Sequence, residues 1–163
     1  MTRNSKLTKK VLVGVLVVLV AIQLVPYGRD HSNPPVVAEP TWNASDTRAT
    51  FFRVCANCHS NETTWPWYSH VAPASWLVQW DVDRARAELN VSRWGMDENE
   101  GDKAAKMVRT NRMPPRTYLW AHREARLTDE ERRQFETGLA ATFGSHRSKR
   151  GNDDVGEKSG YLD

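Results

Sequence analysis

Two cysteines and a histidine stand close together in the chain, in the pattern Cys-Ala-Asn-Cys-His at residues 55–59. Two thiols at this spacing can each add across one of the two vinyl groups of haem b, which gives two thioether bonds. The histidine that follows offers an imidazole to the iron, and imidazole is a usual axial ligand of haem iron. The pattern therefore predicts one covalently attached haem c per chain, held by Cys55 and Cys58 and ligated by His59.

Other chemistries use the same residue types. A thioredoxin-like redox pair also has the form Cys-x-x-Cys, but no alternating strand–helix pattern surrounds this one. A zinc site would need both cysteines and two of the five histidines, and no histidine pair with the usual zinc spacing follows. A disulfide between the two cysteines would close too small a loop to stabilise the fold much. A haem-free thiol-redox or zinc module is thus one alternative function.

A low-spin haem iron takes a sixth ligand, and the downstream candidates are His70, Met96, Met107, Met113 and His122. Met113 is favoured because Pro114 and Pro115 follow it, end a helix there and force an extended loop that can present a thioether to iron. Met107 is expected inside a helix, where methionine more often packs in a core. His122 is the alternative distal ligand. An open distal position would instead suit a haem-based sensor or a peroxidase-like site.

The N-terminus carries an apolar run, residues 11–25, preceded by the basic residues Arg3, Lys6, Lys9 and Lys10. Together with residues 26–28 the run is near the lower length limit for crossing a bilayer. Basic residues ahead of it favour a cytoplasmic N-terminus and an exported C-terminal domain. A cleaved signal peptide shares these features, although no small-x-small cleavage pattern follows the run. The sequence predicts a cytoplasmic basic segment at 1–10 and a transmembrane anchor at 11–28.

Beyond the anchor, the chain divides into a proline-rich linker at 29–44, a domain at 45–144 and a polar, disordered tail at 145–163. The linker is expected to act as a semi-extended tether. No segment of the domain shows sustained period-2 alternation, so an all-α fold is predicted. The hydrophobic core of a domain of about 100 residues gives only marginal stability, and a cofactor would help to complete that core.

Four helices are expected in the domain. The first is capped by Ser45 or Asp46 and leads to Cys55, and the third covers about 97–110. The second runs from about 73–75 to 89, with an apolar stripe formed by Trp76, Leu77, Trp80 and Ala87. The last begins with a capping box at Thr128, and Gly144 ends it. Trp65, Trp67, Tyr68, Trp76 and Trp80 would either line a haem pocket or form ordinary core.

Charge and residue pattern exclude several function classes. The net charge is only +3, and basic residues are spread among acidic ones, so no nucleic-acid partner is expected. The sequence shows neither a Ser/His/Asp set nor a pair of carboxylates of the kind that hydrolytic enzymes use. An electron carrier is therefore favoured over a catalyst. Tyr118 is expected either to donate a hydrogen bond to a haem propionate or to orient the loop that carries Met113.

The chain resembles the small bacterial haem-binding-domain family, whose members are single-haem c-type proteins with an N-terminal anchor. The resemblance covers about residues 23–143, and its most specific block is 55–68. The matching segments are 28–30, 33–35, 55–63, 65–69, 72–73, 75–76, 89–90, Trp94, 113–115, Tyr118 and Leu127. Departures are Ala85 and Val91, where glycine and phenylalanine are usual, and Arg123, where proline is frequent.

The resemblance implies a cytochrome c-like helical fold, with Cys55, Cys58 and His59 holding haem and Met113 as the distal ligand. The residues and the resemblance together predict a single-pass protein of the bacterial inner membrane. Its haem domain would lie on the periplasmic side and transfer single electrons to a redox partner protein that the sequence does not identify.

Overall fold

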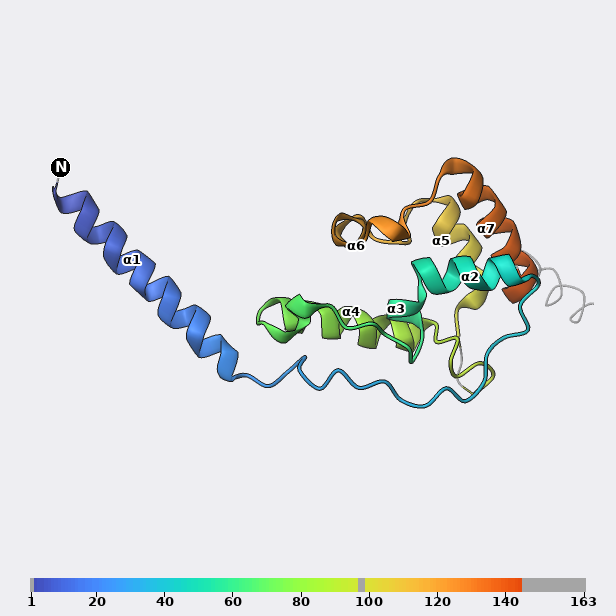
Figure 1. Ribbon diagram of the computed structural model, residues 1–163, viewed down its shortest axis with the longest axis horizontal. Helices are drawn as coiled ribbons and strands as arrows, with labels where there is room; N and C mark the ends of the chain where they lie inside the picture. Colours follow the sequence, from blue (N-terminus) through green and yellow to red (C-terminus); the bar gives the residue numbers. More distant parts are fainter. Residues whose placement is uncertain (1, 97–98, 145–163) are drawn as a thin grey trace, which may run out of the picture.

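The computed structural model describes residues 2–96 and 99–144, and within them the regular structure is helical, with no strand. The prediction of an all-α domain behind an N-terminal apolar helix is confirmed (Figure 1). The tail expected to be disordered, residues 145–163, lies outside the described residues.

The N-terminal helix α1 spans Thr2–Ala21 and continues as the short helix η1, Ile22–Leu24. Its segment Ser5–Leu24 is long and apolar enough to cross a membrane, and none of it is buried in the domain; a signal sequence has the same features. The helix begins earlier than the expected span and ends before residues 25–28. Lysine is a good helix former, which allows the early start, whereas Val25 is extended, as a residue before proline tends to be.

The segment between η1 and the domain, residues 25–44, is extended, as its prolines predict. It does not hang free as a tether, because it is hydrogen-bonded along the domain, and we call it the N-terminal strap. The Val37 N–H donates to the Ser92 carbonyl at 2.8 Å, and the Trp94 N–H donates to the Ala38 carbonyl at 3.0 Å. These bonds form an isolated parallel bridge between Ala38 and Arg93. Figure 1 shows the strap running beneath the helices.

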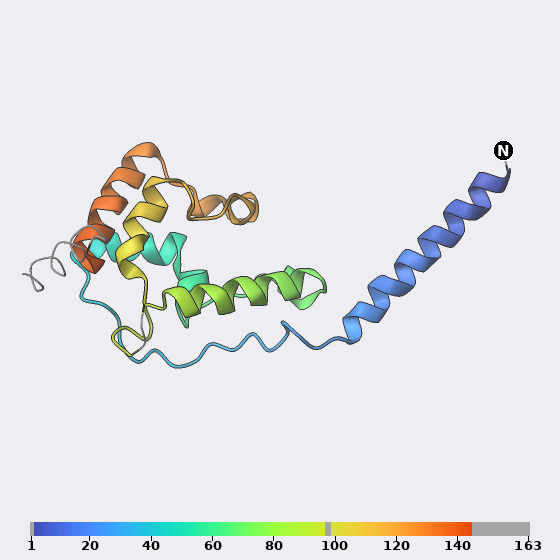
Figure 2. The ribbon, with the colours of Figure 1, turned by 180° about the vertical axis from the view of Figure 1, so that it is seen from behind.

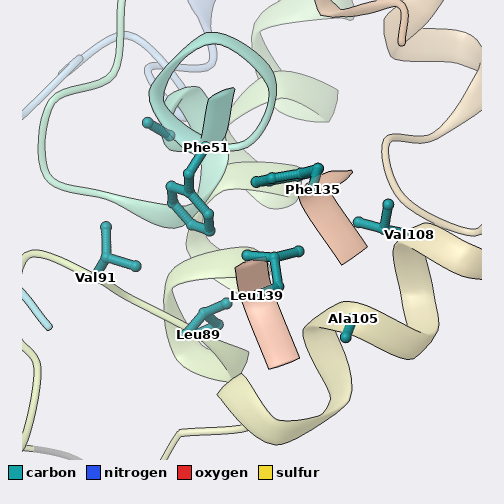
Figure 3. Packing of buried hydrophobic residues seen from close by; sticks show 8 residues of the cluster. Phe51, Leu89, Val91, Ala105, Val108, Phe135 and Leu139 are labelled. Atoms are coloured by element: carbon teal, nitrogen blue, oxygen red, sulfur yellow. The ribbon is translucent and has the colours of Figure 1, made fainter. Parts of the chain in front are cut away.

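The domain consists of short helices: α2 (Ser45–Val54), α3 (Ala56–His59), η2 (Trp67–His70), α4 (Ala74–Glu88), α5 (Gly101–Arg109), α6 (Arg116–Ala121), η3 (Arg123–Ala125) and α7 (Asp129–Phe143). Helices α5 and α7 pack side by side, with α2 against α7 (Figure 2). At this crossing Gly138 meets Thr47 so closely that a Cβ atom would collide with the threonine side chain. The buried cluster is formed by Phe51, Ala56, Leu89, Val91, Ala105, Val108, Phe135 and Leu139 (Figure 3).

Helix ends match the expectations in part. The capping box of α7 is confirmed, since the Glu131 N–H donates to Thr128 Oγ1 at 3.2 Å and the Thr128 N–H donates to Glu131 Oε2 at 2.8 Å. Helix α2 differs, because its N-cap is Ala44 and both Ser45 and Asp46 lie in the first turn. The Ser45 hydroxyl bonds the Asp46 carboxylate at 3.4 Å instead of capping a backbone N–H.

Helix α5 begins at Gly101, later than the expected start near residue 97. Two competing hydrogen bonds explain the delay. The Glu100 N–H donates to the Glu88 carbonyl at 2.8 Å, at the end of α4. The Gly101 N–H donates to Asn99 Oδ1 at 3.2 Å, and an asparagine side chain that bonds the backbone locally favours a turn over a helix.

Candidate functional site

The Cys-Ala-Asn-Cys-His pattern lies at the junction of α2 and α3. Cys55 stands between the two helices with φ −122°, and its N–H still donates to the Phe51 carbonyl at 2.8 Å. The Cys55 carbonyl in turn accepts the N–H groups of Cys58 and His59, both at 3.0 Å. Both thiols are free. One tight turn, residues 55–59, thus brings together the three residues that the sequence singled out. We call it the attachment turn, after the haem attachment that the sequence predicts there.

The ring of His59 is held by the end of helix α4. Its Nδ1 lies 2.9 Å from the Leu89 carbonyl oxygen and 3.1 Å from the Ala85 carbonyl oxygen. Two carbonyl oxygens can only accept, so Nδ1 carries the proton and the lone pair is on Nε2. Burial lowers the pKa of His59 and keeps the imidazole neutral, although the two carbonyls work in the opposite direction. A neutral imidazole whose second nitrogen donates to a carbonyl is the usual form of a metal-ligating histidine.

The two cysteines have the electrostatics of unreactive thiols. Burial raises the pKa of Cys55 to about 12, with a further contribution from Cys58. Burial and then the carboxylate of Asp81 raise the pKa of Cys58 to about 11, against a lowering by Arg86. Redox-active and zinc-binding cysteines act as thiolates and lie where the thiol pKa is depressed. Residues 2–96 and 99–144 also contain no group of three or more His, Cys, Asp or Glu side chains placed to hold a metal ion.

Helix α4 approaches the site with small side chains, contrary to the expected stripe of large ones. Ser75, Val82 and Ala85 form its buried face. Leu77 and Trp80, by contrast, are 59% and 51% exposed. A small side chain at position 85 lets the α4 backbone come close enough for its carbonyl to reach the His59 ring. Of the expected stripe, Leu77, Trp80 and Ala87 lie on the exposed face, and Trp76 is half-buried.

Arg86, also on α4, is a positioning residue that the sequence reasoning missed. Its Nε donates to the Ser60 carbonyl at 2.9 Å, directly after the attachment pattern. Its Nη2 donates to Thr63 Oγ1 at 3.0 Å and to Asn33 Oδ1 at 3.1 Å, and its Nη1 donates to the Ser32 carbonyl at 3.3 Å. One guanidinium thus joins α4, the chain after the pattern and the strap. Partial burial lowers the pKa of Arg86.

Two of the three positions named as departures in the sequence, Ala85 and Val91, are buried in the core. The Val91 N–H donates to the His59 carbonyl at 3.0 Å, so this position also supports the attachment turn.

Met113 and His122 come from the segment after α5, more than fifty residues along the chain from His59. Met113 is half-buried, and its N–H donates to the Met107 carbonyl at 3.2 Å. The His122 ring stacks on the Tyr118 ring, with centroids 3.9 Å apart, and its Nδ1 lies 3.1 Å from the Tyr118 carbonyl oxygen. Both residues thus flank helix α6, which contains Tyr118.

Tyr118 connects this segment to the attachment turn. Its hydroxyl accepts a hydrogen bond from Asn57 Nδ2 at 2.9 Å, and Asn57 lies between the two cysteines. Burial raises the pKa of Tyr118 to about 12, so the phenol stays protonated. The contact favours an orienting role for Tyr118 over a propionate contact, and it places α6 beside the turn that carries the cysteines.

Several aromatic side chains that were expected to line a pocket or form core are not buried. Trp67 and Trp80 are exposed, whereas Trp65, Tyr68 and Trp76 are half-buried. The indole nitrogens of Trp65 and Trp76 are buried without a hydrogen-bond partner in the structure. Half-buried rings with unpaired indole N–H groups suit a surface that a large planar cofactor would cover.

The fold and the site define a small helical domain in which a histidine directly follows the second of two cysteines and has its Nδ1 fixed by the end of α4. A family model described as a haem-binding domain matches residues 17–141, which is most of the chain, and the protein belongs to this family. Haem is accordingly its cofactor. No curated protein and no solved structure matches the chain.

Proposed function

We propose that this protein is a membrane-anchored, single-haem c-type cytochrome that transfers one electron at a time. The observation that carries the proposal is the pair of hydrogen bonds from His59 Nδ1 to the carbonyls of Leu89 and Ala85. These bonds orient the ring and leave Nε2 as the ligating atom, one residue after a cysteine that can form a thioether. A thiol-redox or zinc function would need thiolates, which the raised pKa values of both thiols disfavour.

Each residue of the site has a defined part in the proposal. Cys55 and Cys58 would hold the haem through two thioether bonds, each formed by adding an S–H across one vinyl group, so that no atom leaves and no oxidant is needed. His59 would ligate the iron, and Met113 would supply the second protein ligand, with His122 as its alternative. Once bound, haem supplies reversible one-electron exchange between Fe(II) and Fe(III). Arg86 and Tyr118 position the attachment turn.

The apolar helix α1 supports the membrane part of the proposal. Its lysines precede the apolar run, which favours a cytoplasmic N-terminus and a domain on the exported, periplasmic side. This orientation agrees with the proposed haem attachment, because c-type haem is attached to proteins on the exported side of the membrane. The proposal predicts that the mature chain keeps α1 and sediments with membranes, whereas a signal sequence would be removed and leave a soluble product.

Covalent attachment is tested by extraction of the purified protein with acidified acetone. Wild-type protein should keep its haem colour, and intact mass should exceed the polypeptide mass by one haem. The Cys55→Ala/Cys58→Ala double variant should yield protein without covalent haem, while Glu62→Ala, an exposed change near the pattern, should match the wild type. Free extraction of haem from the wild type would contradict the c-type assignment.

A further inference from the structure

The end of the apolar helix is fastened to the domain through the side chain of Gln23. Its Nε2 donates to the Ala72 carbonyl at 2.9 Å, and its Oε1 accepts the Ala72 N–H at 3.0 Å. Gln23 lies in η1, immediately after α1, and Ala72 lies in the turn between η2 and α4. A paired amide contact of this kind fixes orientation as well as distance, because both bonds must be satisfied together.

Two more contacts hold the first part of the strap on the same end of the domain. Gly28 has φ +76° and lies so close to the Ser75 carbonyl that a Cβ atom would collide with it. Further along, His31 Nε2 is 3.0 Å from the Ser69 carbonyl oxygen, and the His31 ring stacks on Trp65 with centroids 4.8 Å apart. The chain that leaves α1 is therefore bound to the η2 and α4 region from its first residues.

The length of the apolar helix determines how deep Gln23 lies in the lipid bilayer. Over the 20 residues of Ser5–Leu24 an α-helical rise of 1.5 Å per residue gives roughly 30 Å, about the thickness of the hydrocarbon in a bilayer. Lysine side chains near its N-terminus can extend to the headgroups. A span that just matches the hydrocarbon thickness places its C-terminal end, and with it Gln23, at the hydrocarbon–headgroup boundary. Ala72, which Gln23 binds, then lies at the same level.

The surface around this contact is apolar and exposed. Leu24 is 84% exposed, Trp67 79% and Val71 49%. Leu24 adjoins Gln23, Val71 adjoins Ala72, and Trp67 begins η2 in the same turn region. In Figures 1 and 2, η2 and the start of α4 form the end of the domain that faces α1. Tryptophan is enriched at membrane interfaces, because its ring is apolar and its N–H is polar.

We infer that the domain rests against the lipid headgroup layer of the membrane that α1 crosses, with Trp67, Val71 and Leu24 as the lipid contact and the Gln23–Ala72 pair holding that orientation. The inference rests on the proposed function in one respect, namely that α1 stays in the mature protein as an anchor. The occupant of the apolar surface is lipid because the surface continues directly from the membrane-spanning helix. The haem domain is thereby held at the membrane and does not move on a flexible tether.

The test uses the full-length, haem-loaded protein in phosphatidylcholine vesicles. A photocrosslinking amino acid, p-benzoylphenylalanine, replaces Trp67 or, as a matched control, Trp120 on α6, which is equally exposed at 78%. After irradiation, lipid adducts are measured by mass spectrometry and membrane retention by sedimentation. Position 67 should give several-fold more lipid adduct than position 120. Adding Gln23→Ala should reduce that difference, whereas Gln134→Ala on α7 should not.

The outcomes separate the inference from the proposed function. Equal adduct at both positions, in protein that sediments with vesicles, would overturn the lipid contact and leave the anchor standing. Crosslinks from position 67 to haem or to another part of the chain would also overturn it, because that surface would then have a different occupant. A soluble product that lacks α1 would overturn both the anchor and the inference, with haem attachment unaffected.

Discussion

The Nδ1 atom of His59 lies 2.9 Å from the carbonyl oxygen of Leu89, thirty residues further along the chain. Leu89 is the C-cap of α4, where carbonyls have no helical partner and are free to accept. The end of one helix thus supplies the acceptor that determines which nitrogen of the histidine carries the proton and which keeps its lone pair. A second carbonyl, that of Ala85, shares the same N–H at 3.1 Å.

Ala85→Leu should disturb this relationship by overpacking the contact between α4 and the attachment turn. We expect a loss of about 1–3 kcal/mol in the free energy of unfolding, together with lower haem loading, because the carbonyls move away from the His59 ring. Ala87→Leu lies on the exposed side of the same helix and should change stability by no more than about 0.5 kcal/mol. Urea denaturation and the haem-to-protein absorbance ratio measure both effects. Equal behaviour of the two variants would contradict a packing role for Ala85.

Met113→Ala should expose the iron if Met113 is the distal ligand. A thioether favours Fe(II) relative to imidazole, so its loss should lower the reduction potential and allow rapid carbon monoxide binding to the reduced protein. Spectra of the oxidised and reduced protein and a redox titration measure these changes.

Two further variants assign the distal ligand. Met107→Ala is the matched control and should leave the spectra unchanged, with a stability loss below the about 2–5 kcal/mol of a fully buried methionine, since Met107 is half-buried. A low-spin spectrum that survives Met113→Ala but not His122→Ala would identify His122 as the ligand. Rapid carbon monoxide binding by the unmodified protein would instead favour a sensor or peroxidase-like role.

Arg86→Gln should loosen the connection among α4, the attachment turn and the strap. The variant leaves the Ser60 carbonyl, the Thr63 hydroxyl and Asn33 without a charged donor, and we expect a loss of about 1–3 kcal/mol in unfolding free energy. Arg84→Gln removes an exposed ion pair with Glu88 and a contact with the exposed Trp80 ring, and should cost no more than about 1 kcal/mol. Urea denaturation at neutral pH compares the two, and a larger loss for Arg84→Gln would rule out the positioning role of Arg86.

The strap should detach more readily in acid because of Glu39. Two hydrogen bonds from Arg48, at 2.7 and 2.8 Å, hold the pKa of the Glu39 carboxyl below its ordinary value of 4.5. A depressed carboxyl pKa contributes stability that is fully present above pH 4.5 and is lost as pH falls through the lower, folded-state pKa. Both side chains are partly exposed, so the contribution is about 0.5–1 kcal/mol.

Glu39→Gln should therefore reduce stability at pH 7 and bring the variant closer to the wild type at pH 3. Thermal unfolding across that pH range measures the difference between the two proteins. Arg48→Gln should show the same loss that disappears in acid, together with a pH-independent loss of its contact with the Phe52 ring. The double variant should lose no more than Arg48→Gln alone. A constant difference at all pH values would show that the ion pair does not stabilise the strap.

Local features of the chain were predictable from the sequence. The attachment turn, the capping box at Thr128 and the apolar helix depend on residues within a few positions of one another, so their types and spacing suffice to identify them. The preference for helix over strand follows from the same short-range pattern.

Long-range contacts were decided only by the tertiary structure. The acceptors for His59 are backbone carbonyls, which every residue possesses, so no side-chain type marks Leu89 or Ala85 as partners. The Gln23 side chain likewise binds backbone groups of Ala72, which no side-chain type marks. The prolines of the strap predict that it is extended, but they do not predict where on the domain it binds. Helical period also leaves open which face of α4 is buried, and close approach to His59 selects the face with small side chains.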